Sequence, residues 1–266
     1  MLNVSELTLK FGDSPVLNGV NFKISQGERV GIIGPNGSGK TTLFNAISGF
    51  NRTTSGIIDF NGTNITALSP ARRARLGLGR VFQNFGIFRE MSLEENLLTA
   101  IESRESKTFF TSRKADKERR EKALEFLALV KLEGKAKDKA GSLSGGQMRL
   151  LEITRTIAFG SELFLLDEPT AGVSPKMKQE IEAALGALQH LGKTIIIIEH
   201  DINFIQKLCD RILVLDQGRV VLDGTPEQVR QDSRLQEIYF GSQKNNGSKT
   251  NGAHPLAAVT NLAHVG

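Results

Sequence analysis

Segments near the start of the chain alternate apolar and polar residues. Asn3–Lys10 and Val16–Ile24 follow this pattern and are separated by Gly12–Pro15. Alternation with period two is typical of a strand with one buried face, and Gly-Asp-Ser-Pro favours a turn. A further segment, Gly56–Phe60, runs into Asn61-Gly62, a dipeptide that favours a tight hairpin. The pattern therefore predicts antiparallel strands at the N-terminus.

Several later segments are apolar at nearly every position, as expected of strands that are buried on both faces of a parallel sheet. Helical segments separate them, in the order of an α/β unit. The predicted strands of this kind are Arg29–Ile33, Leu163–Leu166 and Thr194–Ile198, with Arg80–Phe82 as a further short strand, and the predicted helices are Thr41–Gly49, Pro175–Leu191 and Asn203–Cys209. A second hairpin, Arg211–Leu215 with Arg219–Asp223, is predicted around Gln217-Gly218.

The middle of the chain has helical character. Ser92, followed by Glu94 and Glu95, begins one predicted helix, and Asp116–Val130 forms a strongly amphipathic one. These features predict a helical insertion at about residues 88–160 of one domain that spans residues 1–241. Residues 242–266 are rich in Asn, Gly, Ser and Lys and hold no acidic residue, so we expect a disordered tail. No internal repeat is present.

Composition restricts the class of protein. A single cysteine, Cys209, excludes an internal disulfide and a thiolate metal cluster, and the N-terminus lacks a secretory signal, so we expect a protein that is not exported. The longest apolar runs are far shorter than the roughly 20 residues that span a bilayer. The net charge of +5 is modest. Residues Ser103–Lys122 hold eight Lys or Arg against four Asp or Glu, which favours a solvated face, with a surface near anionic lipid as the alternative. No nucleic-acid partner is expected.

A glycine-rich loop follows the apolar strand Arg29–Ile33 and precedes a helix. Glycines let backbone amides converge on phosphate oxygens, and the helix N-terminus adds the positive end of its dipole. Lys40 is expected to reach the β- and γ-phosphates of ATP, and the Thr41 hydroxyl to ligate Mg²⁺. The predicted nucleotide-binding residues of this loop are Gly34, Pro35, Asn36, Gly37, Ser38, Gly39, Lys40, Thr41 and Thr42.

Two carboxylates end the apolar strand Phe164–Leu166. Asp167 can hold Mg²⁺, and Glu168 can orient or deprotonate the attacking water. In combination with the phosphate loop, this pair predicts nucleotide hydrolysis. The phosphate loop alone does not separate kinases, GTPases, helicases and transport ATPases.

Further motifs resemble the ABC ATPase family. Leu143-Ser144-Gly145-Gly146-Gln147 matches the signature LSGGQ, Gln83 matches the Q-loop, and His200 resembles the switch histidine. The resemblance covers about residues 1–241. It implies a P-loop, RecA-like mixed sheet with an N-terminal antiparallel β subdomain and a helical insertion subdomain.

The resemblance also assigns roles to individual residues. His200 contacts the γ-phosphate and positions the water that Glu168 polarises, with Lys40 and Gln83 as the other catalytic residues and Thr41, Gln83 and Asp167 on Mg²⁺. Phe11 stands where the family places an aromatic ring against adenine, and Val16 is assigned to the same site. Ser144, Gly145, Gly146 and Gln147 form a second phosphate-binding edge at a helix that runs to about Phe159.

That second edge implies two subunits, because the chain already contains one complete phosphate loop. In the family it closes over the ATP of a partner. With one set of motifs and no repeat, the chain is expected to pair with another ABC ATPase subunit, identical or not. The family often has Asp where this chain has Ser174, which leaves the cross-subunit contact of that loop open, although Ser174 can still cap the next helix ahead of Pro175.

Phe88–Leu98, Gly146–Ile153 and Ala171-Gly172 resemble importer ATPases for branched-chain amino acids. This resemblance implies two membrane permeases, docked around Gln83–Glu95, an indirectly linked solute-binding protein, and a peripheral location on the cytoplasmic face of the inner membrane. Transporters of urea or other amino acids remain alternatives, as do an exporter and a soluble ABC ATPase that does not serve transport.

Overall fold

The computed structural model describes residues 1–82, 86–105 and 112–241. Two sheets organise these residues. The first is antiparallel, with strand order β2-β1-β4-β5, and the second has order β10-β9-β3-β8-β7-β6. The first sheet comprises β1 (Leu2–Phe11), β2 (Ser14–Ile24), β4 (Ser55–Phe60) and β5 (Thr63–Asn64). The second comprises β3 (Arg29–Ile33), β6 (Leu78–Val81), β7 (Leu163–Asp167), β8 (Thr194–Ile198), β9 (Arg211–Asp216) and β10 (Arg219–Gly224).

The second sheet is mixed. Strands β9, β3, β8, β7 and β6 pair in parallel, and only β10 runs antiparallel, as the partner of β9 in a hairpin. Strands β7 and β8 are buried at every position, which is why they are apolar apart from Asp167 at the end of β7 and Thr194 at the start of β8, rather than alternating. The predicted antiparallel N-terminus, mixed sheet and C-terminal hairpin are confirmed.

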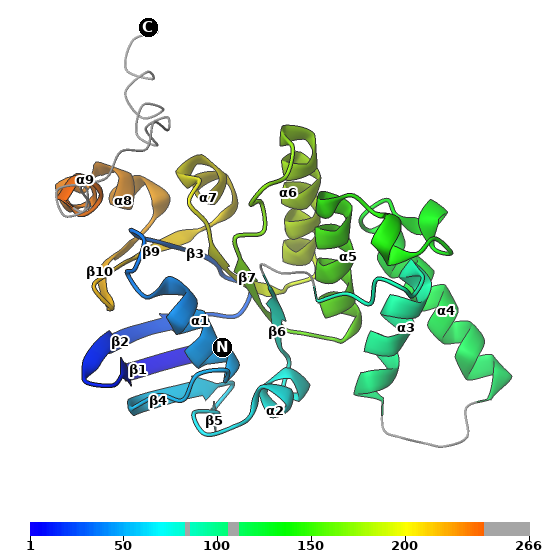
Figure 1. The fold of residues 1–266 in the computed structure, drawn as a ribbon, viewed down its shortest axis with the longest axis horizontal. Coiled ribbons are helices and arrows are strands. Elements are labelled where there is room, and N and C mark those ends of the chain that lie inside the picture. Colours follow the sequence, from blue (N-terminus) through cyan, green and yellow to red (C-terminus); the bar gives the residue numbers. More distant parts are fainter. Residues whose placement is uncertain (83–85, 106–111, 242–266) are drawn as a thin grey trace, which may run out of the picture.

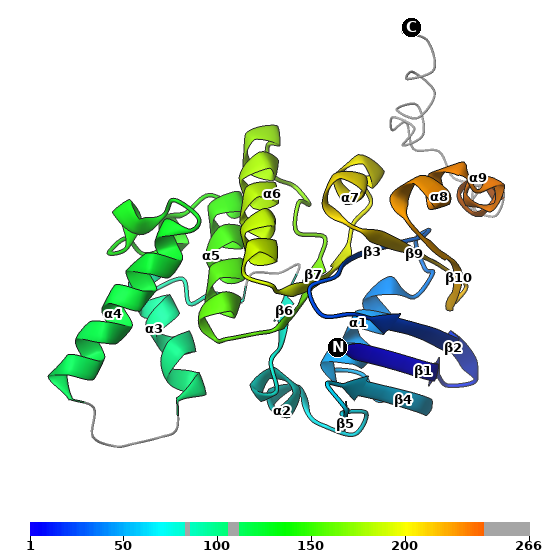
Figure 2. The same ribbon diagram turned by 180° about the vertical axis from the view of Figure 1, so that it is seen from behind.

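Helix α1 lies between the two sheets (Figures 1 and 2). Leu43, Phe44 and Ile47 of this helix belong to one buried cluster with side chains from both sheets. The opposite face of the second sheet packs in another cluster against the remaining helices other than α2. The helices are α1 (Lys40–Ser48), α2 (Pro70–Arg75), α3 (Leu93–Arg104), α4 (Arg113–Ala128), α5 (Gly145–Ala158), α6 (Pro175–His190), α7 (Ile202–Leu208), α8 (Pro226–Gln231) and α9 (Ser233–Gly241), with short 3₁₀ turns at Glu133–Lys135 and Ala140–Ser142.

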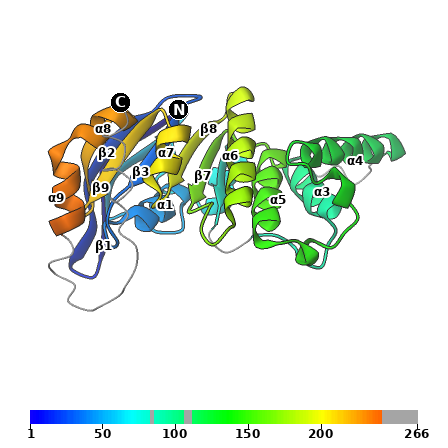
Figure 3. The ribbon, with the colours of Figure 1, turned by 90° about the horizontal axis from the view of Figure 1, so that it is seen from above.

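Helices α3, α4 and α5 form the predicted helical insertion. Helices α3 and α4 lie at one end of the molecule and α9 at the other, with α5 between α6 and the α3–α4 pair (Figure 3). Ser92 begins α3 with a capping box, in which its side chain accepts from the Glu95 amide and Glu95 accepts from the Ser92 amide. The predicted start of this helix is therefore confirmed.

Sequence analysis did not predict α2, α8 and α9. In α2 the buried side chain is Arg73, whose guanidinium donates to the carbonyl oxygens of Ala46, Ile47, Leu68 and Thr66. A charged residue in the buried position hides the helical periodicity. The capping box of Thr225 with Gln228 was a local signal for α8.

Candidate nucleotide-binding site

The glycine-rich loop lies between β3 and α1. Gly34, Gly37 and Gly39 have φ angles of 152°, 81° and 105°, in the region that residues with a Cβ rarely adopt. A Cβ on Gly34 would also lie 2.0 Å from the carbonyl oxygen of Leu215. Gly39 is the N-cap of α1 and gives the first turn no side-chain acceptor. The amide groups of this turn are therefore available to an anion, and the predicted loop and helix order is confirmed.

Lys40 turns its side chain back over the loop. Its Nζ donates to the carbonyl oxygens of Gly34 at 2.8 Å and Pro35 at 2.9 Å. Burial lowers the pKa of Lys40, and the charges of Glu168 and Asp167 oppose that shift. Among the described residues, the buried Ser38 hydroxyl has no hydrogen-bond partner. A buried cation beside an unsatisfied hydroxyl is suited to an anionic, oxygen-rich ligand.

The acidic residues and the histidine share one edge of the sheet with this loop. Strands β3, β8 and β7 are parallel neighbours, so their carboxyl ends lie together. The loop follows β3, Asp167 and Glu168 end β7, and His200 follows β8. Ligands of open α/β sheets bind at the carboxyl ends of the strands. The tertiary structure thus brings together residues that lie more than a hundred positions apart in the sequence.

Asp167 and Glu168 have different surroundings. Asp167 is buried, and its Oδ2 accepts from Arg80 at 3.2 Å. Burial raises the pKa of Asp167, and the adjacent Arg80 charge counteracts this. Glu168 is more accessible, and its Oε1 lies 2.9 Å from Nε2 of His200. The first carboxylate is suited to holding a cation, and the second to handling a proton or a water molecule.

The predicted metal ligands fit a magnesium ion by their chemistry. Asp167 and Thr41 offer hard oxygen donors, and Mg²⁺ in such sites is bound by one or two carboxylates together with phosphate oxygens. No group of three or more His, Cys, Asp or Glu side chains that could hold a metal occurs in the described parts of the chain.

The segment Ser144–Gln147 begins α5. The Ser144 side chain accepts from the Gln147 amide, and the Gln147 side chain accepts from the Ser144 amide. Ser144 and Gly145 are exposed, whereas Gly146 packs against Met177 of α6. Strands β6 and β7 separate α5 from α1 (Figures 1 and 3). Within one chain, the exposed start of α5 and the phosphate loop thus remain apart.

Of the two residues assigned to adenine, Val16 lies beside the phosphate loop. Phe11 ends β1 with 59% of its surface exposed, and the carbonyl oxygen of Val16 lies 3.0 Å from where a Cβ on Gly39 would be. The amide of Gly218, in the β9–β10 turn, donates to the Ser38 carbonyl oxygen at 3.0 Å. The antiparallel sheet and the C-terminal hairpin therefore both adjoin the loop. Phe11 pairs with Ser14, two residues before Val16 in the chain.

Gln83 lies outside the described residues. The residues on either side of its segment are held by α5, because Oε1 of Glu152 accepts from the amides of Phe82 and Gly86, each at 3.1 Å. Oε2 of Glu152 pairs with Arg149 at 2.8 Å, and Arg149 also donates to the Phe82 carbonyl oxygen. Burial raises the pKa of Glu152, and the Arg149 charge opposes this. Sequence analysis missed this pair, for which an Arg and a Glu three residues apart on one predicted helix were the only signal.

Ser174 occupies the N-cap of α6, where its side chain accepts from the Met177 amide at 3.3 Å and Pro175 follows in the first turn. The prediction that Ser174 caps this helix is confirmed. Upstream in the same loop, Thr170 donates from its amide and its hydroxyl to the buried Glu199, which precedes His200. The loop after Glu168 is thereby tied to the end of β8.

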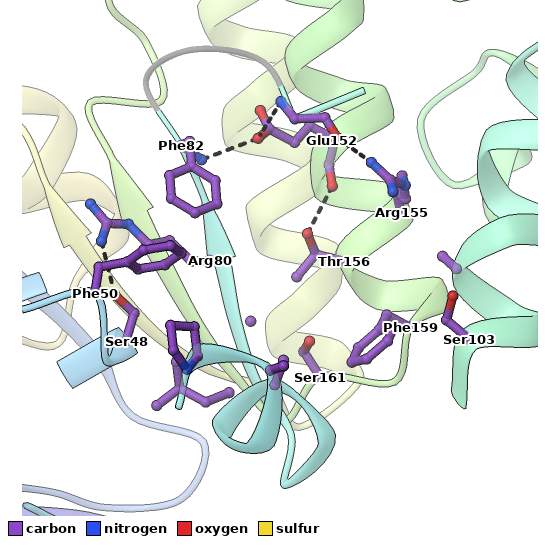
Figure 4. A pocket seen from close by; sticks show the side chains of 17 residues that line it. Ser48, Phe50, Arg80, Phe82, Ser103, Glu152, Arg155, Thr156, Phe159 and Ser161 are labelled. Carbon is purple, nitrogen blue, oxygen red and sulfur yellow. Dashed lines mark hydrogen bonds between the residues drawn. The ribbon is translucent and has the colours of Figure 1, made fainter. Parts of the chain in front are cut away.

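A cavity of about 390 Å³ lies between the sheet and the helical insertion (Figure 4). Its wall includes Phe50, Arg80 and Phe82 on the sheet side and Glu152 and Arg155 on α5. The side chain of Arg155 also lies over the ring of Phe88, 4.4 Å from its centroid. The cavity therefore adjoins the same segment that joins β6 to the helical insertion.

Comparison with known proteins identifies the family. The ABC transporter family model matches residues 17–171. The chain is 38% identical over 249 residues to the high-affinity branched-chain amino acid transport ATP-binding protein BraF of Pseudomonas aeruginosa. It is 36% identical over 249 residues to the corresponding protein LivG of Escherichia coli. Each comparison covers 91% of this chain and 98% of the relative. The chain is 32% identical over 243 residues to the lipopolysaccharide export system ATP-binding protein LptB of Haemophilus influenzae, with the same coverage.

Solved structures agree with this result. The ADP conformation of MJ1267, an ATP-binding cassette of an ABC transporter, superposes with a TM-score of 0.80 at 33% identity and covers 91% of this chain and 98% of its own. The dimeric cassette MJ0796, bound to ADP and Pi, superposes with a TM-score of 0.74 at 30% identity, covering 85% of this chain and 99% of its own. The chain therefore belongs to the ABC transporter family, as an ATP-binding cassette with the fold of an ATPase.

Proposed function

We propose that this chain hydrolyses MgATP to power the import of branched-chain or similar hydrophobic amino acids through separate permease subunits. The observation that carries the ATPase part is the meeting of Lys40, Asp167, Glu168 and His200 at one edge of the sheet. The observation that carries the cargo is the similarity to BraF and LivG over 91% of the chain.

Each residue has a distinct task in this proposal. The amides of Gly34–Thr42 and the Lys40 ammonium bind the β- and γ-phosphates, while Phe11 and Val16 contact the base. Thr41 and Asp167, with Gln83, hold Mg²⁺, which neutralises charge on the phosphates when bound. Glu168 accepts a proton from the attacking water, and His200 orients that water and contacts the γ-phosphate.

The active unit in this proposal is a dimer with a second ABC ATPase subunit. Ser144, Gly145, Gly146 and Gln147 of one subunit close over the nucleotide of the other. The exposure of Ser144 and Gly145 at the start of α5, away from the phosphate loop of the same chain, supports this arrangement. The dimeric form of MJ0796 supports it as well.

The permease is proposed to dock at the cavity between the sheet and the helical insertion, next to the segment that includes Gln83. An exposed aromatic side chain, Phe50, and two arginines in its wall suit a short helical segment of a permease subunit. A solute-binding protein would select the cargo outside, and the chain would act as a peripheral subunit on the cytoplasmic face of the membrane. No described helix is long and apolar enough to cross a bilayer.

Leucine uptake tests the cargo. Cells that lack this chain are complemented with the wild type or with Glu168→Gln, and the uptake of labelled leucine and urea is measured separately. Only the wild type should restore leucine uptake, with urea uptake unchanged throughout. Loss of urea uptake instead would favour the urea alternative, and a defect in lipopolysaccharide export would favour the function of the relative LptB.

Co-purification tests the docking surface. The tagged chain is isolated from detergent-solubilised membranes as the wild type and as two variants. Ala71→Trp places a large side chain in the lining of the cavity. Ala183→Trp, at an exposed position of α6, is the matched control. The wild type and the control should retain two permeases and a second ATPase, while Ala71→Trp should lose the permeases. Recovery of ribosomal or DNA-repair proteins instead would overturn the transport proposal.

A further inference from the structure

Arg80 of β6 binds three side chains from two other elements. Its Nη1 donates to Asn45 Oδ1 at 2.6 Å and to Ser48 Oγ at 2.8 Å, both on α1. Its Nη2 donates to Oδ2 of Asp167, at the end of β7, at 3.2 Å. Only 7% of the Arg80 side chain is exposed. The planar fork of a guanidinium makes these contacts in one fixed geometry, which a lysine cannot reproduce.

Two aromatic rings hold the same guanidinium from the side of the cavity. Its central carbon lies 4.9 Å from the ring centroid of Phe82 and 5.7 Å from that of Phe50. The two rings contact each other edge to face, with centroids 5.5 Å apart. Figure 4 shows Phe50, Phe82, Arg80 and Ser48 together at the cavity. Arg80 therefore touches the cavity wall and the acidic edge of the sheet at once.

The arrangement limits how the Asp167 side chain can turn. Its backbone is fixed in a buried strand, so the orientation of the carboxylate depends on the side-chain torsions and on its partners. Arg80 engages Oδ2, which fixes the direction in which the other oxygen faces. Displacing Phe50 or Phe82 would move the guanidinium and, through it, this carboxylate.

We infer that Arg80 is a positioning residue, which orients Asp167 for the bound Mg²⁺–nucleotide and makes that orientation depend on the aromatic side chains of the cavity wall. The inference rests on the proposed function in taking Asp167 as a magnesium ligand and the cavity as the docking surface. It adds a direct mechanical connection between the proposed docking cavity and the metal-binding carboxylate.

Binding of a fluorescent ATP analogue, measured with Mg²⁺ and separately with EDTA, tests the inference. Arg80→Lys keeps the charge and loses the fork. Its dissociation constant should stay within about twofold of the wild type in EDTA and rise at least fivefold in Mg²⁺. Phe50→Leu, at an exposed position, should raise only the dissociation constant in Mg²⁺, by about two- to threefold. The double variant Phe50→Leu with Arg80→Lys should have the same dissociation constant in Mg²⁺ as Arg80→Lys alone.

Arg29→Lys is the matched control, because Arg29 also pairs with an aspartate, Asp210, but lies at the other end of β3 from the phosphate loop. It should leave both dissociation constants unchanged. The inference is overturned if Arg80→Lys behaves like Arg29→Lys, if it weakens binding by the same factor with and without Mg²⁺, or if the Phe50 and Arg80 effects simply add. Failure of the wild type to bind the analogue in either buffer would instead refute the proposed ATPase function.

Discussion

Nε2 of His200 lies 2.9 Å from Oε1 of Glu168, although 32 positions separate the two residues. Each follows a different strand, β8 and β7, and the parallel pairing of these strands places the two ends side by side. Glu168 has a φ of 49°, and its amide donates to the Ile198 carbonyl oxygen at 2.9 Å. The backbone thus directs Glu168 toward His200, and the two side chains can act on one water molecule.

Glu168→Gln should lower the rate of ATP hydrolysis by at least about 10²-fold, because the amide cannot accept a proton from water. ATP affinity should stay unchanged, and size-exclusion chromatography in MgATP should show a dimer of this chain that the wild type does not accumulate. Glu118→Gln, at an exposed position of α4, is the control with the same chemical change. A Glu168→Gln protein that hydrolyses ATP at the normal rate would exclude Glu168 as the general base.

His200→Ala should also reduce hydrolysis by about 10²-fold, and its effect should not add to that of Glu168→Gln. Non-additivity follows from the shared contact, because removing either side chain leaves the other without its partner in positioning water. Single-turnover hydrolysis by the two single variants and the double variant measures this coupling. Fully additive losses would show that the two residues act independently.

Glu152→Ala should lower the free energy of unfolding by about 3–5 kcal/mol, because it removes the carboxylate that balances buried Arg149 and accepts from two backbone amides. Urea denaturation measures the loss. Glu90→Ala breaks an exposed pair with Lys139 and should cost at most about 1 kcal/mol. Equal losses in the two variants would contradict a special role for the contact between α5 and the segment after β6.

Ser174→Ala should lower stability by about 1 kcal/mol through loss of the α6 cap, whereas Ser174→Asp should preserve it, since aspartate caps equally well. Thermal unfolding of the wild type, Ser174→Ala and Ser174→Asp gives the order of their stabilities. If Ser174 acts only as a helix cap, both variants should hydrolyse ATP at the rate of the wild type. A loss of activity in Ser174→Ala at unchanged stability would instead assign it to the contact between subunits.

Cys209 should resist thiol reagents in the native protein. Burial raises the pKa of this thiol to about 12, so roughly 10⁻⁴ of it is thiolate at pH 8, against about a quarter for an unfolded cysteine. Reaction with Ellman's reagent should be slow until urea unfolds the chain. As Cys209 is the single cysteine, the reaction reports on one site. Fast modification of the folded protein would show that this part of the core opens readily.

Local sequence determined much of this protein. Continuous apolar runs identified strands β3, β7 and β8, and the glycines of the phosphate loop identified its backbone, because these features depend on residues that are close in the chain. The caps at Ser92, Ser144 and Ser174 followed from the same local chemistry. The family motifs assigned the nucleotide-binding residues without knowledge of where they meet.

Only the tertiary structure decided which of these residues touch. The strand order β3-β8-β7 brings His200 to Glu168, and the pairing of β6 with β7 brings Arg80 to Asp167. No local pattern marked Arg80, Arg73 and Glu152 as buried, because the sequence does not record that a charged side chain is buried among partners contributed by distant elements. Burial and pairing of charges depend on how sheets and helices pack, and that packing is a property of the whole fold.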